Sequence, residues 1–513
     1  MKTELRSPGL AAILCLVAGL AQALALAWPG SGEPIWWLQL LALGVLAGLL
    51  ERTRSWREAA ALGWLFATAW LGGTFWWLFI SLHTYGGLPA WLAGLAVLVL
   101  AAVLALYYDC LRFVCEVSAS SPGPEGAAVC RPLAAGRAGK GALVHRLWLG
   151  RHRLRSYRRS AGRLCALAGR VWPGALAAWL SMTLPQAWSC GPWQRVAAMA
   201  VLVWPSVWQM DRGAAQAGYS VAAGQLQVAL LQGNIAQDEK FQPGSGVPLA
   251  LQWYGEQLRD NTAALVVAPE TAIPLLPSQL PEGYQQALLE RFARGEQAAL
   301  LGQPLGSYSQ GYTNSALGLK PAQASPWRYD KHHLVPFGEF IPPFFRWFTE
   351  LMNIPLGDFR RGSVDQASFE WQGQRLALNI CYEDLFGEEL ARRFADPALA
   401  PTMFVNLSNI AWFGNTVAIA QHLQITRMRS LEFERPFLRA TNTGATAVVD
   451  HHGQVRAALP PHTRGVLRAE VQGRSGLTPY ARWMSQLGLW PLWLAGLATV
   501  GLAWAARHRA RRG

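Results

Sequence analysis

The amino-acid sequence predicts a multi-span α-helical membrane bundle joined to a layered α/β domain, and three observations support this fold class. Hydrophobic residues make up 52% of the 513-residue chain and charged residues only 15%, against roughly 25% charged in an ordinary soluble domain. Apolar windows long enough to span a bilayer occur near both ends of the chain. Residues 225–474 instead alternate short β-rich runs with helical ones, as layered α/β domains do. The composition excludes a disordered chain, a fibrous repeat and a simple soluble enzyme.

The membrane bundle is predicted from runs of mostly apolar residues. A spanning helix needs about 20 of them, and six windows reach or approach that length: residues 10–28, 34–50, 59–80, 89–108, 164–182 and 487–506. The fifth is the weakest, because Arg170 and Pro173 interrupt it. A cleaved signal peptide is the alternative interpretation of the first window, but further spans follow it at once. We therefore expect residues 1–210 to form an N-terminal transmembrane bundle and residues 484–506 a C-terminal transmembrane helix.

Basic residues near the ends of these windows predict how the chain crosses the membrane. Lys and Arg concentrate on the cytoplasmic side, and here they precede the first window, separate the second from the third and follow the last: Lys2, Arg6, Arg52, Arg54, Arg57, Arg507, Arg509, Arg511 and Arg512. Both termini, including a basic tail at residues 507–513, are then cytoplasmic, and the polar segment 211–483 lies on the other side. Much of the net charge of +14 is therefore a topology signal, so we expect no binding to nucleic acid.

Residues 108–210 differ from the rest of the chain. They carry thirteen Lys or Arg and three acidic residues, a net charge of +10, together with five of the seven cysteines. The run RHRLRSYRR at residues 151–159 has neither helical nor strand periodicity, and the Cys and His spacings fit no metal-ligand pattern. The stretch is interpreted either as a basic cytoplasmic loop or as out-of-frame translation produced by a compensated frameshift. Resequencing the gene decides between them, because an unbroken frame that reproduces these residues removes the frameshift.

The polar segment contains the predicted strands and helices of the α/β domain. Short apolar runs predict strands at residues 226–231, 264–268, 298–301, 376–380, 402–407 and 445–450. Helical patterns lie between them, for example at residues 281–294 and 418–434. About 250 residues suffice for one large α/β core, so residues 211–483 are predicted to form a single domain.

Three chemically reactive residues lie at predicted strand ends or beside proline-rich apolar segments. Cys381 follows the strand 376–380, Glu270 lies between prolines after the strand 264–268, and Lys331 heads an apolar segment. α/β proteins place active residues at such strand ends. A carboxylate can activate a thiol as a nucleophile, and a lysine can stabilise a developing oxyanion, so the set suits acyl transfer through a thioester. The structural alternatives are a buried cysteine, a solvated turn carboxylate and a surface lysine.

Longer motifs around these residues carry a family resemblance. They are PETAIP at residues 269–274, YDKHHLVPFGEFIP at 329–342, NICYEDLFG at 379–387 and the run beginning NLSNIAWFG at 406–450. These motifs resemble the nitrilase, or carbon-nitrogen hydrolase, superfamily, whose triad is Glu, Lys and Cys. With apolar windows on both sides, the chain resembles the bacterial apolipoprotein N-acyltransferase family, strongly over residues 225–475 and by layout over residues 1–107 and 484–506.

The resemblance implies a role for each residue of the triad. Glu270 is the general base, Lys331 the oxyanion partner and Cys381 the nucleophile. Three further positions support the triad: Tyr382, whose N–H completes the oxyanion hole, Glu383 and Glu339. The resemblance also implies an αββα sandwich that faces the periplasm, over a bundle of eight helices in the bacterial inner membrane. We expect no cofactor and no metal.

The reaction implied by the resemblance is the last step of lipoprotein maturation. Cys381 takes an acyl chain from a phospholipid, typically phosphatidylethanolamine, and a lysophospholipid leaves. The N-terminal α-amine of a diacylglyceryl apolipoprotein then attacks the thioester. Both substrates are lipids, and each buried CH₂ contributes about 0.8 kcal/mol, so such a site has to open to the bilayer. The aromatic-rich segment 340–362 is either an apolar arm that dips into the membrane or part of an aromatic core.

Two other functions would use these residues differently. A membrane-anchored nitrilase-type amidase would combine the same triad with water as the acceptor, but a small polar substrate needs no membrane spans. An inactive membrane scaffold follows if residues 108–210 are as written. Retention of Glu270, Lys331 and Cys381 together argues against a scaffold, so the sequence favours the acyltransferase.

Overall fold

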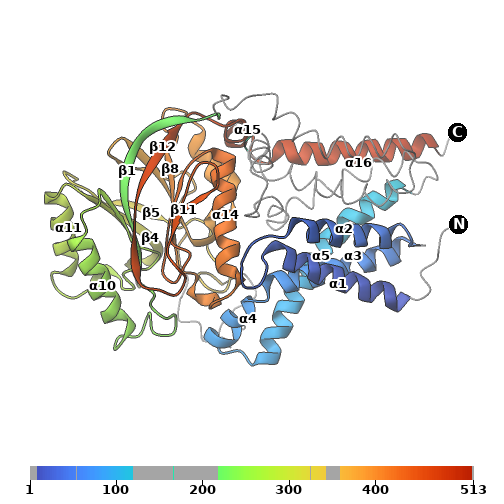
Figure 1. The fold of residues 1–513 in the computed structure, drawn as a ribbon, viewed down its shortest axis with the longest axis horizontal. Coiled ribbons are helices and arrows are strands. Elements are labelled where there is room, and N and C mark those ends of the chain that lie inside the picture. Colours follow the sequence, from blue (N-terminus) through green and yellow to red (C-terminus); the bar gives the residue numbers. More distant parts are fainter. Residues whose placement is uncertain are drawn as a thin grey trace. The chain divides into compact units, whose positions relative to one another are not determined.

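The computed structural model divides the chain into two compact units (Figure 1). The residues that it describes are 8–53, 55–119, 166, 218–323, 325–341 and 359–510. The helical unit comprises Met1–Phe79, Ala90–Gln216 and Leu487–Gly513, and the sandwich unit comprises Ile80–Pro89 and Ala217–Gln486. Three sequence predictions lie wholly or mostly outside the described residues, and they stay predictions: the span at 164–182, the interpretation of 108–210 and the membrane-dipping arm at 340–362.

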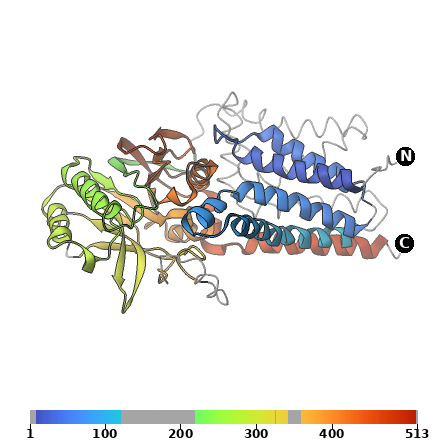
Figure 2. The ribbon, with the colours of Figure 1, turned by 90° about the horizontal axis from the view of Figure 1, so that it is seen from below.

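The apolar windows near both ends of the chain form helices in the helical unit. The described ones are α1 (Pro8–Leu26), α2 (Trp36–Leu50), α3 (Trp56–Phe75), α5 (Ala90–Ala119) and α16 (Trp490–Ala510). α3 packs against α1 and α5, and α16 runs along α5 (Figure 2). Among the described helices, α1 is by itself long and apolar enough to cross a membrane, whereas α2 and Ala90–Leu106 of α5 are apolar but shorter.

The window at residues 59–80 was predicted as one span, and the structure breaks it. The chain leaves α3 and continues as α4 (Leu78–Ile80) and the π-helix η1 (Ser81–Tyr85), bent by 61°. Near the break, the Thr74 hydroxyl donates to the carbonyl oxygen of Trp70 at 2.8 Å, a bond that bends helices, and two adjacent glycines lower the local helix propensity. If the bent pair counts as one span, the described residues hold up to two candidate spans.

Small residues allow α1 and α3 to approach closely. A Cβ added to Gly19 would lie 2.5 Å from the carbonyl oxygen of Phe66 and 2.8 Å from the Cβ of Ala69. A Cβ added to Gly73 would lie 2.9 Å from the Cβ of Ala23. Glycine and alanine at such contacts are what lets helix backbones pack tightly in a membrane protein.

Gly19→Ala is therefore expected to lower the Tm of the full chain in detergent. The added methyl group meets the backbone of α3, and overpacking of this kind costs about 1–3 kcal/mol. Thermal unfolding followed by tryptophan fluorescence measures the change. Gly94→Ala on α5 is the matched control, because no described atom lies within 4 Å of a Cβ there. Equal falls in Tm for the two variants would contradict the packing argument.

Two mixed β-sheets packed face to face form the sandwich unit (Figure 1). Their strand orders are β12-β1-β2-β3-β4-β5 and β11-β10-β9-β8-β7-β6. The strands are β1 (Val221–Gln232), β2 (Leu265–Val267), β3 (Ala298–Ser307), β4 (Gly311–Leu319), β5 (Trp327–Asp330), β6 (Phe369–Trp371), β7 (Gln374–Ile380), β8 (Met403–Ser408), β9 (Phe437–Thr441), β10 (Ala447–Val449), β11 (Val455–Ala458) and β12 (Gly465–Ser475). In each sheet three central strands are parallel, β1-β2-β3 and β7-β8-β9, so their carboxyl ends meet at one edge.

Helices cover the outer faces of the two sheets. α10 (Gly246–Asp260) and α11 (Tyr284–Arg294) pack on the first sheet, and α14 (Val417–Phe433) packs on the second (Figures 1 and 2). The apolar core between the sheets takes residues from both, among them Leu226, Val228, Leu230, Leu376, Leu378, Ile380, Val405 and Leu438. This order of layers confirms the αββα sandwich expected from the sequence.

The strands predicted from apolar runs are all present as β1, β2, β3, β7, β8 and β10, and both named helices form α11 and α14. The sequence analysis did not predict β4, β5, β6, β9, β11 or β12. β12 shows why such strands escape notice: it pairs with β1 along most of its length, but most of its residues are exposed or only partly buried. A strand of this kind has no apolar run, and pairing with a buried neighbour holds it in the sheet.

The short segment Ile80–Pro89 belongs to the sandwich unit rather than the helical one. The ring of Tyr85 lies 5.8 Å from that of Trp412, nearly perpendicular to it. Trp412 is part of the 3-10 helix η6 (Ile410–Phe413), which directly follows β8 and its carboxyl-terminal turn. This segment therefore packs beside the strand ends where the reactive residues were predicted.

Candidate active site

Cys381 follows the carboxyl end of β7 and begins the short helix η4 (Cys381–Leu385). Its φ is +56°, in the left-handed region that residues other than glycine seldom adopt, and such strained conformations cluster at functional sites. Burial, reinforced by the charge of Glu270, raises the pKa of Cys381 to about 12. At neutral pH the thiol therefore keeps its proton, and it needs a base to become a nucleophile.

Glu270 lies in the turn after β2 and is 6% exposed. Its Oε1 accepts hydrogen bonds from Asn314 Nδ2 at 2.7 Å and from Lys331 Nζ at 3.2 Å. Its Oε2 accepts the backbone N–H of Asn409 at 2.8 Å. The turn rests directly on β3, because a Cβ added to Gly302 would lie 2.7 Å from the Cα of Glu270. Both carboxylate oxygens are thus fixed by groups from separate strands or strand ends.

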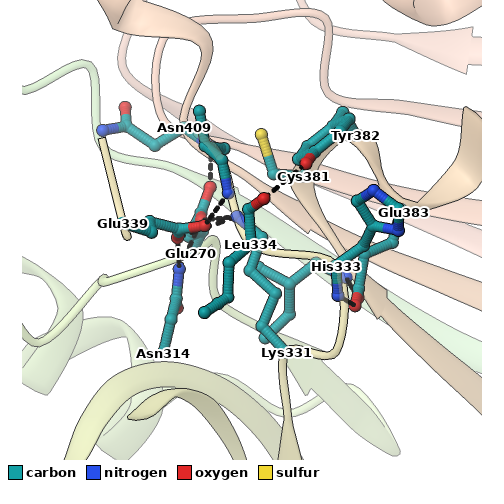
Figure 3. Close-up of polar contacts among 12 residues, drawn as sticks. Glu270, Asn314, Lys331, His333, Leu334, Glu339, Cys381, Tyr382, Glu383 and Asn409 are labelled. Atoms are coloured by element: carbon teal, nitrogen blue, oxygen red, sulfur yellow. Dashed lines mark hydrogen bonds and ion pairs between the residues drawn. The ribbon is translucent and has the colours of Figure 1, made fainter. Parts of the chain in front are cut away.

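Lys331 follows β5 and is 1% exposed. Its ammonium lies between two carboxylates, 3.2 Å from Glu270 Oε1 and 2.9 Å from Glu339 Oε1. Asn314 Nδ2 also donates to Glu339 Oε1, at 2.6 Å, so the lysine and the amide both bridge the carboxylates (Figure 3). Burial lowers the pKa of the lysine, but the charges of Glu270, Glu339 and Cys381 raise that pKa well above its ordinary value. The ammonium therefore stays charged at neutral pH.

Glu383 connects the Lys331 segment to the Cys381 turn. Its buried carboxylate accepts four hydrogen bonds: from the backbone N–H of Ile380 at 2.6 Å, of His332 at 2.7 Å and of His333 at 3.0 Å, and from the hydroxyl of Tyr329 at 2.8 Å. Tyr382 makes a second connection, because its hydroxyl donates to the carbonyl oxygen of Leu334 at 2.8 Å. These bonds hold the lysine and the thiol in a fixed relation.

All six predicted site residues lie in one cluster (Figure 3). Glu270, Lys331 and Glu339 share hydrogen bonds and ion pairs, and the charges of all three act on the Cys381 thiol. Tyr382 and Glu383 follow the cysteine in η4. Among the described residues there is no group of three or more His, Cys, Asp or Glu that could hold a metal ion.

The sequence analysis missed Asn314 and the backbone N–H of Asn409. Asn314 is 3% exposed within β4, whose neighbouring residues are also buried. Asparagine is depleted in strands, so an asparagine inside an otherwise β-like run was the available signal. The contribution of Asn409 is a backbone group, and no residue-type pattern could have indicated it.

If Cys381 takes an acyl chain as the family resemblance implies, Asn314→Asp is expected to slow that acylation by at least about tenfold at pH 7.5. The substitution removes the shared donor and places a third carboxylate against two others, and like charges at this range oppose one another. The rate is measured by intact mass after mixing the purified chain with phospholipid. Gln310→Glu, which adds the same charge at an exposed position of the β3–β4 hairpin, is the control and should acylate normally. Equal rates for the two variants would remove Asn314 from the site.

Known proteins resemble this chain over most of its length. The family model "Carbon-nitrogen hydrolase" matches residues 227–480, and the model "Apolipoprotein N-acyltransferase N-terminal domain" matches residues 18–135. An apolipoprotein N-acyltransferase from Verminephrobacter eiseniae is 54% identical over an alignment that covers 92% of each chain. One from Ralstonia nicotianae is 41% identical and covers 93% of this chain and 90% of its own length. One from Bordetella bronchiseptica is 36% identical and covers 97% of both.

Proposed function

Because the chain belongs to the apolipoprotein N-acyltransferase family, we propose that it completes lipoprotein maturation by acylating the N-terminal amine of apolipoproteins. The acyl chain comes from a phospholipid and passes through a thioester on Cys381. The observation that carries this mechanism is the buried set of Glu270, Lys331 and Glu339 beside the Cys381 thiol. Such a set offers a nucleophile, a base and a fixed positive charge in one site.

The first half-reaction forms the thioester. Glu270 takes the proton from the Cys381 thiol, and the sulfur attacks the carbonyl carbon of a phospholipid ester. The tetrahedral intermediate collapses, and the bond between the acyl carbon and the glycerol oxygen breaks. The leaving glycerol oxygen takes the proton back from Glu270. A lysophospholipid departs, and the acyl chain stays on the sulfur. A thiol with a pKa of about 12 requires this transfer, since free thiolate is scarce at neutral pH.

Lys331 and the backbone N–H of Tyr382 stabilise the oxyanion of each tetrahedral intermediate. Lys331 suits this role because its ammonium is buried, charged and held by two carboxylates, so it does not have to reorganise during the reaction. Glu339 and Glu383 position these two oxyanion donors. Glu339 accepts a hydrogen bond from the Lys331 ammonium. Glu383 accepts backbone N–H bonds from His332, next to the lysine, and from Ile380, next to the cysteine.

The second half-reaction discharges the thioester to the acceptor. The α-amine of the diacylglyceryl-cysteine attacks the thioester carbonyl, Glu270 accepts a proton from the amine, and the C–S bond breaks as the proton passes to the sulfur. The products are an amide on the lipoprotein and the free thiol. Keeping water away from the thioester favours the amine over hydrolysis.

The family also supports a proposal for placement in the cell. The helical unit lies in the bacterial inner membrane, the sandwich unit is the periplasmic catalytic domain, and residues 507–513 are a cytoplasmic tail. The apolar helices near both ends of the chain and the positions of the Lys and Arg clusters support this arrangement. We propose phosphatidylethanolamine as the donor on the family resemblance alone. Like any phospholipid of the same bilayer, it reaches the site without leaving the membrane.

The experiment that tests this function is the intact mass of the purified chain after incubation with phosphatidylethanolamine in detergent micelles. A gain of one acyl chain, absent in Cys381→Ala and lost when a diacylglyceryl-cysteine peptide is added, is the expected result. The peptide should gain the same mass. An adduct that is lost to water equally fast with and without the peptide would overturn the acyltransferase in favour of a lipid hydrolase. The absence of any adduct on the folded native chain would overturn both the acyltransferase and the hydrolase.

A further inference from the structure

One buried lysine of the sandwich unit has no part in the mechanism above. Lys240 lies in the segment that follows β1, and it is 1% exposed. Among the described residues its ammonium donates to one acceptor, the backbone carbonyl oxygen of Glu270, at 3.0 Å, and it lies 5.9 Å from the centre of the Phe241 ring. A buried ammonium is costly unless opposite charge lies near it.

The charges that oppose this cost are those of the active site. Burial lowers the pKa of Lys240 to about 7, and the charge of Glu270, together with that of Cys381 once the thiol is ionised, acts in the opposite direction. The site otherwise sets two buried carboxylates, Glu270 and Glu339, against the single ammonium of Lys331. With Lys240 charged, these four groups sum to zero, and without it they sum to −1.

The net charge of these four groups decides how easily the Cys381 thiol ionises. Transfer of the proton from Cys381 to Glu270 leaves the total charge unchanged, so a neutral site stays neutral while the sulfur is negative. In a site of net charge −1 the same thiolate forms against uncompensated negative charge, which raises the pKa of the thiol–carboxylate pair. The Lys240 ammonium donates to the backbone carbonyl of Glu270, so it lies beside the residue that takes the proton.

Two other ionisable groups face Cys381, and neither replaces Lys240. Arg439 interacts with the thiol, but its guanidinium already pairs with the buried Asp384 at 3.3 Å. Tyr382 is neutral at neutral pH, because burial raises the pKa of its hydroxyl. Lys331 is shared between the two carboxylates, so in the part of the chain that the structure describes Lys240 is the remaining cation.

We propose that Lys240 is a positioning residue for the acyl transfer, whose ammonium holds the main chain of Glu270 and supplies the second positive charge that the Cys381 thiolate needs. The inference rests on the proposed function for the role of the thiol. It extends that function by assigning the charge balance of the site to a residue outside the triad. In the step concerned, the S–H bond breaks, the proton passes to a Glu270 carboxylate oxygen and the electron pair stays on sulfur.

The test is the rate of Cys381 alkylation by iodoacetamide between pH 5.5 and 9.5, measured by peptide mass on the full chain in detergent without lipid. At pH 6, where Lys240 with a pKa of about 7 is mostly charged, we expect at least about tenfold slower alkylation in Lys240→Met than in the native chain. The difference should disappear toward pH 9, where the native lysine is neutral. Lys240→Arg keeps the charge at every pH and should restore the rate at pH 6. Lys320→Met, at a partly exposed lysine after β4, is the matched control and should behave as the native chain.

Several outcomes would overturn the proposal. Alkylation of Lys240→Met that is slower by the same factor at every pH would mean that the lysine acts only on the structure. Failure of Lys240→Arg to restore the rate at pH 6 would exclude charge as the cause. If Lys240→Met does not fold, Lys240→Gln, which keeps a donor for the Glu270 carbonyl without the charge, takes its place. Because alkylation uses no lipid, a native chain that alkylates but never acylates would reject the proposed function, while the alkylation rates would still decide whether the charge of Lys240 supports the Cys381 thiolate.

Discussion

Glu270→Gln is expected to slow the acylation of Cys381 by about 10²–10⁴-fold, the usual contribution of a general base. With a thiol pKa of about 12, on the order of one thiol in 10⁴–10⁵ is ionised without help at pH 7.5. The glutamine has nearly the same shape and can still accept the Asn409 N–H, but it cannot take a proton. Lys331 keeps its bond to Glu339, so the fold is expected to survive.

The measurement is a time course of intact mass after mixing the chain with phosphatidylethanolamine. Glu282→Gln is the control, because this glutamate is exposed in the turn before α11, and it should acylate at the native rate. Thermal unfolding of the three proteins separates a chemical effect from loss of structure. A Glu270→Gln chain that acylates within threefold of the native rate would show that another group takes the proton.

Glu383→Ala is expected to destabilise the chain by at least about 3 kcal/mol and to abolish acylation. The carboxylate accepts four hydrogen bonds, from the backbone of Ile380, His332 and His333 and from the hydroxyl of Tyr329. Each buried donor left without a partner costs about 1–3 kcal/mol. The loss also separates the two segments that carry the lysine and the thiol, because no other carboxylate joins them in this way in the described part of the chain.

The measurement for this variant is the Tm of the purified full chain, which should fall by roughly 5–10 °C for a domain of this size. Glu370→Ala, at an exposed position of β6, is the control and should change Tm little, since surface substitutions are usually within about 0.5 kcal/mol. A Glu383→Ala chain with native Tm and lost acylation would mean that the residue acts in the chemistry and not as the clamp described above.

Local sequence patterns were enough to find the reactive residues. Cys381 and Glu270 each follow a short apolar run, and such runs form buried parallel strands with a functional residue at the carboxyl end. The alternation of strands and helices predicted a layered α/β domain, and the family resemblance implied the αββα sandwich. The two strands before these residues depend on residues close in sequence, and the structure confirms them as β2 and β7.

Composition did not predict the break in the helix within residues 59–80. Hydropathy gives a continuous apolar run there, but helix continuity depends on individual hydrogen bonds such as that from Thr74 to Trp70. The segment Ile80–Pro89 then packs in the sandwich unit, where Tyr85 meets Trp412. Contacts across more than 300 residues leave no periodic signal in either segment.

The sequence by itself identified the candidate residues, because Cys381 and Glu270 follow predicted strands and Lys331 heads an apolar segment, and the family resemblance supplied their expected roles. Only the tertiary structure decided what surrounds them. Asn314, in β4, donates to the carboxylates of Glu270 and Glu339. The backbone N–H of Asn409, after a strand of the other sheet, donates to the second carboxylate oxygen of Glu270. Lys240, in the segment after β1, donates to the backbone carbonyl of Glu270. The physical reason is that these partners come from separate strands or from the segments that follow them, and the order and register of the sheets bring them within hydrogen-bonding distance of one residue, Glu270.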